Sequence, residues 1–188
     1  LIKNGRKYSN EDDGLSYIQV AGEARRPDQG SGWINQIEAQ KVISVMHDIK
    51  ANEINRSMSI GIVTPYRKQV DLITDELTRA NLIGGVSVGT AHTYQGQEKD
   101  IMIFSPVVSK GIDENSALWI SKPPNLLNVA LTRARRKLII VGDMDYCENT
   151  FSGEILSKLA KYCKKIDKLS KISQEQKKLF ELLILNGV

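Results

Sequence analysis

The sequence has few of the residues that metal centres and disulfide scaffolds require. Its 188 residues include two histidines and two cysteines, Cys147 and Cys163. The cysteines form no Cys-x-x-Cys pair, which excludes a four-cysteine zinc site and a disulfide-rich scaffold. We therefore expect no metal site, and this cysteine usage is typical of a reducing compartment, so we expect a cytoplasmic protein.

Long apolar runs and targeting signals are also lacking. No apolar run approaches the roughly 18–20 residues that span a bilayer, so we expect no transmembrane role and no membrane partner. The chain begins at Leu1, without an initiator methionine or the pattern of a signal peptide. We therefore expect it to be part of a longer chain.

Charge of one sign is not in large excess. The 26 basic and 22 acidic residues give a net charge of +4. Residues 164–188 hold six lysines and three acidic residues, so they carry +3 of this charge and residues 1–163 carry only +1. Overall basicity therefore does not identify a nucleic-acid-binding protein. A local cluster is more informative, although solvated helix ends also gather such cations: it comprises Arg133, Arg135, Arg136 and Lys137.

Short apolar runs alternate along the chain with segments of helical spacing. Strands are predicted at 15–21, 59–63, 86–89, 100–105 and 137–142. One helix is predicted to follow Asn35 and Glu38, which resemble a capping box. Another should follow Thr64-Pro65, a cap and first-turn pair, and a third should cover 126–136 after a long loop. Several strands are apolar on both faces, which predicts an α/β domain with a mostly parallel sheet flanked by helices.

The C-terminal part is predicted to be helical. We assign residues 1–165 to one domain whose last helix covers about 153–165, and residues 166–188 to a helical extension. Within the extension, the segment 174–186 is too apolar to stand alone in water. It is expected either to pack back on the domain or to cover a part of the longer chain that this sequence lacks.

Polar side chains are predicted where the strands end. In an open parallel sheet, ligands bind beyond the carboxyl ends of the strands. We expect three segments to meet there: 64–67, 89–98 and 128–136. Thr64 and Thr90 would place hydroxyls at helix N-termini, which suits a phosphate, although Thr-Pro is also a common structural cap.

Three sequence blocks resemble one enzyme family when they are taken together. They are IVTPYRKQV at 62–70, VGTAHTYQGQEKDIMIFS at 88–105 and LNVALTRARRKLIIVGD at 127–143. Their order and wording resemble motifs IV, V and VI in the second RecA-like domain of superfamily 1 helicases, in the RNA-surveillance and replication-helicase (superfamily 1B) branch. The resemblance covers about residues 15–150. It implies a RecA-like fold of the P-loop-NTPase type.

The resemblance implies a part of an ATP site. Glu98 resembles the residue that contacts the nucleotide ribose, with Gly96 beside it. Arg133 resembles the arginine finger on the γ-phosphate, where it would stabilise charge that develops in phosphoryl transfer. Arg135 would bind phosphate or couple the site to the strand, pointing away from Arg133 on a helix. Gln95 resembles the glutamine that couples the ATP and nucleic-acid sites. The alternatives are a solvated turn acid for Glu98 and a surface arginine for Arg133.

The same resemblance implies contacts to single-stranded nucleic acid. Three side chains resemble contacts to the nucleic-acid backbone: Thr64, Thr90 and His92. Tyr66 is a candidate for stacking on a base, with packing in the core as the alternative, and His92 could instead be a hydrogen-bonded structural residue. Trp33 and Trp119 could also stack on bases, although packing is the safer interpretation.

The residues that hold most of a triphosphate are missing from the sequence. No Gly-x-x-x-x-Gly-Lys-Ser/Thr loop is present, and Asp113-Glu114 follows Gly111-Ile112 in a predicted loop rather than a buried strand. We therefore expect ATP with Mg²⁺ as the cofactor, with the metal ligands in a first RecA-like domain outside this sequence. This piece alone should have no meaningful ATPase or unwinding activity.

The resulting hypothesis is the C-terminal motor domain of an ATP-dependent helicase. It would grip single-stranded nucleic acid, with DNA favoured over RNA, and kinship suggests 5′→3′ movement. One alternative is a non-catalytic nucleic-acid-binding module that keeps the fold, although the presence of Gln95, Glu98 and Arg133 together argues against it. Another is a protein-interaction module that uses the apolar segment 174–186.

Overall fold

Five parallel strands form the centre of the molecule. A computed structural model describes residues 14–55, 57–121, 129, 132–151 and 155–165. The sheet has the order β1-β5-β4-β2-β3, and every neighbouring pair is parallel. The strands are β1 Gly14–Gln19, β2 Ile60–Val63, β3 Val86–Gly89, β4 Lys99–Phe104 and β5 Ala134–Gly142. The predicted α/β architecture with a parallel sheet is confirmed.

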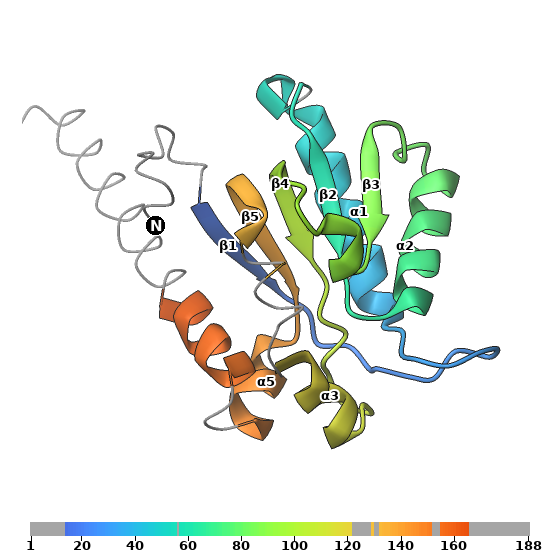
Figure 1. Cartoon of the computed structure of the whole chain (residues 1–188), viewed down its shortest axis with the longest axis vertical. Coiled ribbons are helices and arrows are strands. Elements are labelled where there is room, and N and C mark those ends of the chain that lie inside the picture. Colours follow the sequence, from blue (N-terminus) through green and yellow to red (C-terminus); the bar gives the residue numbers. More distant parts are fainter. Residues whose placement is uncertain (1–13, 56, 122–128, 130–131, 152–154, 166–188) are drawn as a thin grey trace, which may run out of the picture.

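Helices cover both faces of this sheet (Figure 1). The helices α1 and α2 pack on one face, whereas α3, α5 and a helix over residues 155–165 pack on the other. Their bounds are α1 Gln36–Ala51, α2 Arg67–Arg79, α3 Glu114–Ser121 and α5 Met144–Thr150. Two short 3-10 helices, η1 Glu53–Asn55 and η2 Ala91–Tyr94, lie in the connections. Among the described residues, no helix is long and apolar enough to cross a membrane.

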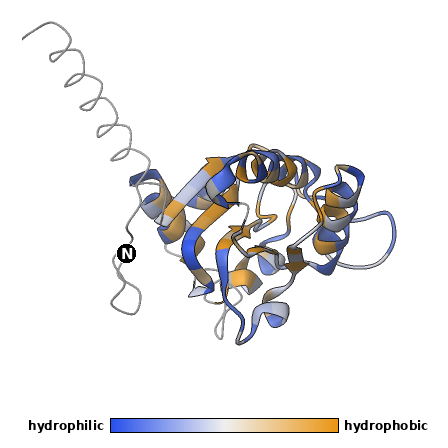
Figure 2. Ribbon diagram, turned by 90° about the horizontal axis from the view of Figure 1, so that it is seen from above, coloured by the Kyte–Doolittle hydropathy of each residue, from blue (hydrophilic) through white to orange (hydrophobic). Residues whose placement is uncertain are grey.

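The strands are apolar on both faces because each face has its own core. Ile101 and Ile103 of β4 belong to the core under α1 and α2. Met102 and Phe104, which alternate with them, belong to the core on the opposite face. This is the period-2 alternation of an extended strand with both sides buried. Figure 2 shows the helices around the sheet from above, with their polar sides turned outward.

The start of α1 matches its predicted cap only in part. The side-chain Oδ1 of Asn35 accepts a hydrogen bond from the backbone N–H of Glu38 at 3.0 Å, as a helix cap does. In a full capping box, Glu38 would bind the backbone N–H of Asn35 in return. That N–H instead donates to Oε1 of Gln69 on α2, at 2.9 Å. The Glu38 carboxylate is therefore available to accept hydrogen bonds from other buried groups.

The start of α2 differs from the prediction. The helix begins at Arg67, with Tyr66 at the cap position, so Thr64-Pro65 is not a cap and first-turn pair. The backbone N–H of Thr64 still donates to the Gly89 carbonyl at 3.1 Å. Extended pairing with β3 therefore continues past the end of β2, which delays the helix.

The segment before β5 also differs from the prediction. What was expected to be loop contains α3, which Asp113 caps by accepting from the Ser116 N–H at 2.8 Å, so Asp113-Glu114 is a helix start. The strand β5 begins at Ala134 rather than at 137, because its pairing with β4 reaches back to Lys99. Arg135 therefore lies on a strand, and its predicted helical separation from Arg133 is wrong. Much of the predicted helix 126–136, and the extension 166–188, lie outside the described residues.

Candidate functional site

The predicted site residues lie at two opposite edges of the sheet. Thr64 and Thr90 follow β2 and β3 and so lie at the carboxyl edge. Glu98 directly precedes β4, and Arg133 directly precedes β5, which places both at the amino edge. The expectation that all three segments meet at the carboxyl edge is therefore wrong for Arg133 in the third segment and for Glu98 at the end of the second. In a parallel sheet, a residue that precedes a strand lies at the amino edge, and a residue that follows a strand lies at the carboxyl edge.

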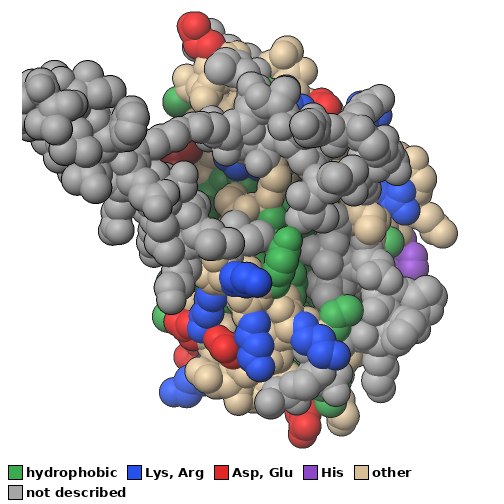
Figure 3. Space-filling view, turned by 90° about the vertical axis from the view of Figure 1, so that its left-hand side faces the viewer, with side chains coloured by type: hydrophobic (Ala, Val, Ile, Leu, Met, Phe, Trp, Pro, Cys, Tyr) green, Lys and Arg blue, Asp and Glu red, His purple; other side chains and the backbone are tan. Residues whose placement is uncertain are grey.

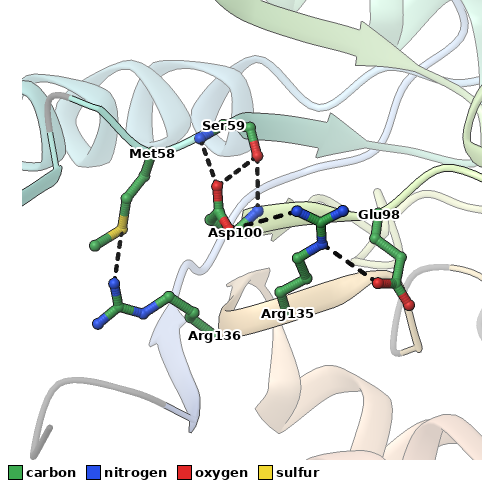
Figure 4. A network of polar contacts seen from close by, with 6 residues as sticks. All are labelled: Met58, Ser59, Glu98, Asp100, Arg135 and Arg136. Carbon is green, nitrogen blue, oxygen red and sulfur yellow. Dashed lines mark hydrogen bonds and ion pairs between the residues drawn. The ribbon is translucent and has the colours of Figure 1, made fainter. Parts of the chain in front are cut away.

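At the amino edge, charged side chains link the starts of β4 and β5 (Figure 4). The Nε of Arg135 lies 3.3 Å from Oε2 of Glu98, and its Nη1 lies 4.0 Å from Oδ1 of Asp100. Glu98 and Arg135 are both exposed. The two residues predicted to contact ribose and phosphate therefore contact each other in this structure.

Asp100 extends this network to β2. Its Oδ2 accepts hydrogen bonds from the Ser59 N–H at 2.9 Å and from the Ser59 hydroxyl at 2.7 Å (Figure 4). Partial burial by itself raises the pKa of Asp100. The hydrogen bonds from Ser59 and the nearby Arg135 outweigh burial and hold the pKa below its ordinary value. Asp100 is therefore an ionised anchor that joins the starts of three strands.

Arg133 lies just before β5 and is half-buried. Its Nε is buried and has no hydrogen-bond partner among the described residues. Its backbone carbonyl accepts from the N–H of Lys99 at 3.0 Å, which fixes the main chain at this point. A fixed backbone with an unsatisfied guanidinium nitrogen suits a group that receives an anionic ligand.

At the carboxyl edge, two of the predicted contacts are buried. The side chain of Thr64 is fully buried, and its hydroxyl has no partner among the described residues. Tyr66 is 9% exposed, its hydroxyl donates to the Ser116 carbonyl at 2.9 Å, and its ring centroid lies 6.1 Å from that of Trp119. Burial raises the pKa of Tyr66. The structure favours the core interpretation of Tyr66 over base stacking.

The tryptophans differ in exposure. Trp33 is buried, and the guanidinium of Arg26 lies over its ring at 4.0 Å from the centroid, so packing describes it well. Trp119 is 49% exposed on α3, rather than in a loop.

The loop after β3 presents exposed polar side chains. Thr90 is half-buried before η2 and its side chain does not cap that short helix. His92 and Gln95 are exposed. Gly96 has a φ of +80°, a left-handed conformation that favours glycine. The segment containing Gln95 and Gly96 leads from the carboxyl edge at β3 to the amino edge at β4.

Comparison with known proteins agrees with this architecture. A family model described as an AAA domain matches residues 3–145, which is most of the chain. The chain belongs to this family and is a superfamily 1 helicase domain. The resemblance predicted from the sequence is confirmed at the level of the family.

The relatives include both a DNA replication helicase and an RNA helicase. The helicase domain is 33% identical over 141 residues to putative helicase MOV-10 of Gallus gallus, covering 66% of this chain and 15% of that protein. It is 39% identical over 116 residues to the DNA replication ATP-dependent helicase/nuclease DNA2 of Gallus gallus, covering 61% and 11%. With RNA helicase Mov10l1 of Homo sapiens it shares 33% over 136 residues, covering 69% and 11%. The chain therefore spans a small part of the length of these relatives.

Solved structures are similar as well. One example is the C-terminal domain of a possible DNA helicase from Lactobacillus plantarum, aligned over 70% of this chain and 74% of its own, with a TM-score of 0.44 and 13% identity.

Sequence reasoning missed a buried polar cluster beneath the carboxyl edge. Glu38 is fully buried, and its Oε2 accepts from the Ser105 hydroxyl at 2.6 Å and from the Val107 N–H at 2.9 Å. Gln69 is also fully buried, and its side-chain amide donates to the Asn35 carbonyl at 3.1 Å. Burial raises the pKa of Glu38 to about 8. In the helicase domain this cluster ties α1 and α2 to the segment that follows β4.

Sequence reasoning also missed the role of Tyr94. It is fully buried, and its hydroxyl oxygen accepts from the Ile62 N–H at 3.1 Å and lies within hydrogen-bonding distance of the Ile62 carbonyl at 3.1 Å. A Cβ at Gly61 would lie only 3.0 Å from the Tyr94 ring, so the glycine makes room for it. The signal for this role is a lone large aromatic in an otherwise polar loop.

Metal-binding side chains are not gathered anywhere in the part of the chain that the structure describes: no group of three or more could hold an ion.

Proposed function

We propose that this domain is the C-terminal motor half of an ATP-dependent helicase. Its amino edge would complete an ATP site whose P-loop and Mg²⁺ ligands lie in a first RecA-like domain of the same protein. The observation that carries the proposal is the unpartnered, buried Nε of Arg133 at an edge that also holds Glu98 and Arg135. Membership of the helicase family supports it.

The side chains at this edge fit the groups of a nucleotide. The always-charged guanidinium of Arg133 would donate to the γ-phosphate and stabilise negative charge during its transfer. The Glu98 carboxylate would accept a hydrogen bond from a ribose hydroxyl. This hydrogen bond would replace the ion pair between Glu98 and Arg135. Bound ATP would supply the phosphoryl group and the free energy for movement.

The carboxyl edge is the proposed track for single-stranded nucleic acid. His92 and Gln95 are exposed there, and Thr90 is half-buried beside them. Contacts to phosphates would give little sequence specificity and a strong dependence on salt. Gln95 lies on the segment that joins the track to Glu98, which supports its proposed role in coupling the two sites. We favour DNA over RNA as the substrate, with 5′→3′ movement.

Replacing the proposed arginine finger tests the motor function. In the full-length protein, Arg133→Ala should lower ATP turnover by roughly 10³-fold or more, because charge on the transferred phosphoryl group is no longer neutralised. Nucleotide binding should remain largely intact. ATP hydrolysis would be measured with and without single-stranded DNA or RNA.

The control for that test is Arg79→Ala, which removes an exposed arginine that pairs with Glu76 of its own helix. It should leave turnover unchanged. Turnover that survives Arg133→Ala would refute the finger assignment. A wild-type protein that hydrolyses no ATP with either nucleic acid would favour a non-catalytic binding module.

A further inference from the structure

The helix over residues 155–165 has a buried face and a basic face. Leu156, Leu159, Ala160 and Cys163 are buried in the core that covers one side of the sheet. Four exposed side chains repeat at helical spacing on the other face. We call them the basic stripe: Lys158, Lys161, Tyr162 and Lys165.

The acidic side chains that the structure describes nearby do not neutralise this stripe. The acidic residues of α5, Asp145 and Glu148, both bind Lys164, with Glu148 at 2.6 Å. These hydrogen bonds raise the pKa of Lys164 and keep it charged. Lys158, Lys161 and Lys165 form no ion pair with any acidic residue that the structure describes. Figure 3, which faces this side of the molecule, shows lysine and arginine side chains gathered on its surface.

Tyr162 adds an aromatic surface to the stripe. It is 45% exposed, one of three large apolar side chains this exposed among the described residues. Its position between Lys161 and Lys165 on one helix face places an aromatic ring among three positive charges. Lysines that follow a phosphate backbone, together with an aromatic ring on which a base stacks, are the combination found in single-strand binding surfaces.

We propose that the basic stripe binds single-stranded nucleic acid, with the three lysines on phosphates and Tyr162 against a base. The stripe lies outside residues 3–145, the segment that matches the family model. The proposal rests on the proposed function, which gives this domain single-stranded nucleic acid as its ligand.

The test is binding of a labelled oligothymidylate to this chain, followed by fluorescence anisotropy at several salt concentrations. Neutralising the three lysines together (Lys158→Gln, Lys161→Gln and Lys165→Gln) should lower the slope of log affinity against log salt by about 2, because about 0.7 counterions are released per phosphate contact. Tyr162→Ala should weaken binding by about 5- to 100-fold and leave the slope nearly unchanged.

A matched control removes the same charge elsewhere. The control variant combines three substitutions on α1 and α2, the helices that cover the opposite face of the sheet: Lys41→Gln, Lys50→Gln and Arg79→Gln. This triple variant should keep the wild-type slope and affinity. Equal losses in the two triple variants, an unchanged slope in the stripe variant, or no binding by the wild-type chain would each overturn the proposal. None of these results bears on the Arg133→Ala assay, which measures hydrolysis in the full-length protein.

Discussion

Among single residues, Glu38 shows best how burial changes chemistry. Its carboxyl group is fully buried, and burial raises its pKa from 4.5 to about 8. Between these pH values the folded protein holds a proton that the unfolded chain releases. The free energy of unfolding should therefore fall as pH rises from about 4.5 to 8, at up to about 1.4 kcal/mol per pH unit from this group.

The variant Glu38→Gln tests this prediction. Glutamine is neutral at every pH and can still accept hydrogen bonds from Ser105 and Val107, so it should flatten the decline in stability between pH 5 and 8. Urea unfolding at several pH values would measure the change. Glu23→Gln, at an exposed position, should behave as the wild type does. Parallel stability curves for the wild type and Glu38→Gln would contradict the prediction.

At the scale of elements, two acidic side chains at the amino edge differ in how strongly they hold the strand starts together. Asp100 accepts from both the N–H and the hydroxyl of Ser59, so Asp100→Ala leaves two donors without their acceptor. We expect it to lower the free energy of unfolding by about 1–3 kcal/mol. Glu98 forms only an exposed pair with Arg135, so Glu98→Gln should cost less than about 1 kcal/mol.

These two variants separate structure from function at the amino edge. Urea unfolding of this chain would compare their stabilities, and ATP hydrolysis by the full-length protein would compare their activities. Glu98→Gln should weaken nucleotide use while the free energy of unfolding falls by less than about 1 kcal/mol. Loss of stability equal to that of Asp100→Ala would show that Glu98 has a structural role instead.

At the scale of the whole molecule, the domain contributes only one side of the proposed ATP site. It has Arg133 and Glu98 but no phosphate-binding loop in its sequence. We therefore expect this chain alone to hydrolyse ATP no faster than buffer, with or without single-stranded nucleic acid. The full-length protein, assayed under the same conditions for released phosphate, should turn over ATP. Equal activity of the two would place the whole site within this chain.

The sequence alone predicts the parts of the fold that depend on local pattern. Apolar runs such as 59–63 and 137–142 identify buried parallel strands, because a strand covered on both faces needs no alternation. Asn35 caps α1 as its side chain predicts. The three motif blocks predict the helicase family, and the family match over residues 3–145 confirms that prediction.

Tertiary structure decides what depends on residues far apart in the chain. Pairing of Lys99 with Ala134 sets the start of β5 and moves Arg135 from the predicted helix to a strand. Packing against α3 buries Tyr66, which the sequence left between core and surface. The separation of the proposed ATP and nucleic-acid sites onto opposite edges follows from the direction in which the chain crosses a parallel sheet. The periodicity of the sequence indicates which face of a helix or strand is apolar. Which residues become buried, and which lie at opposite edges of the sheet, depends on the elements that pack against them in the fold.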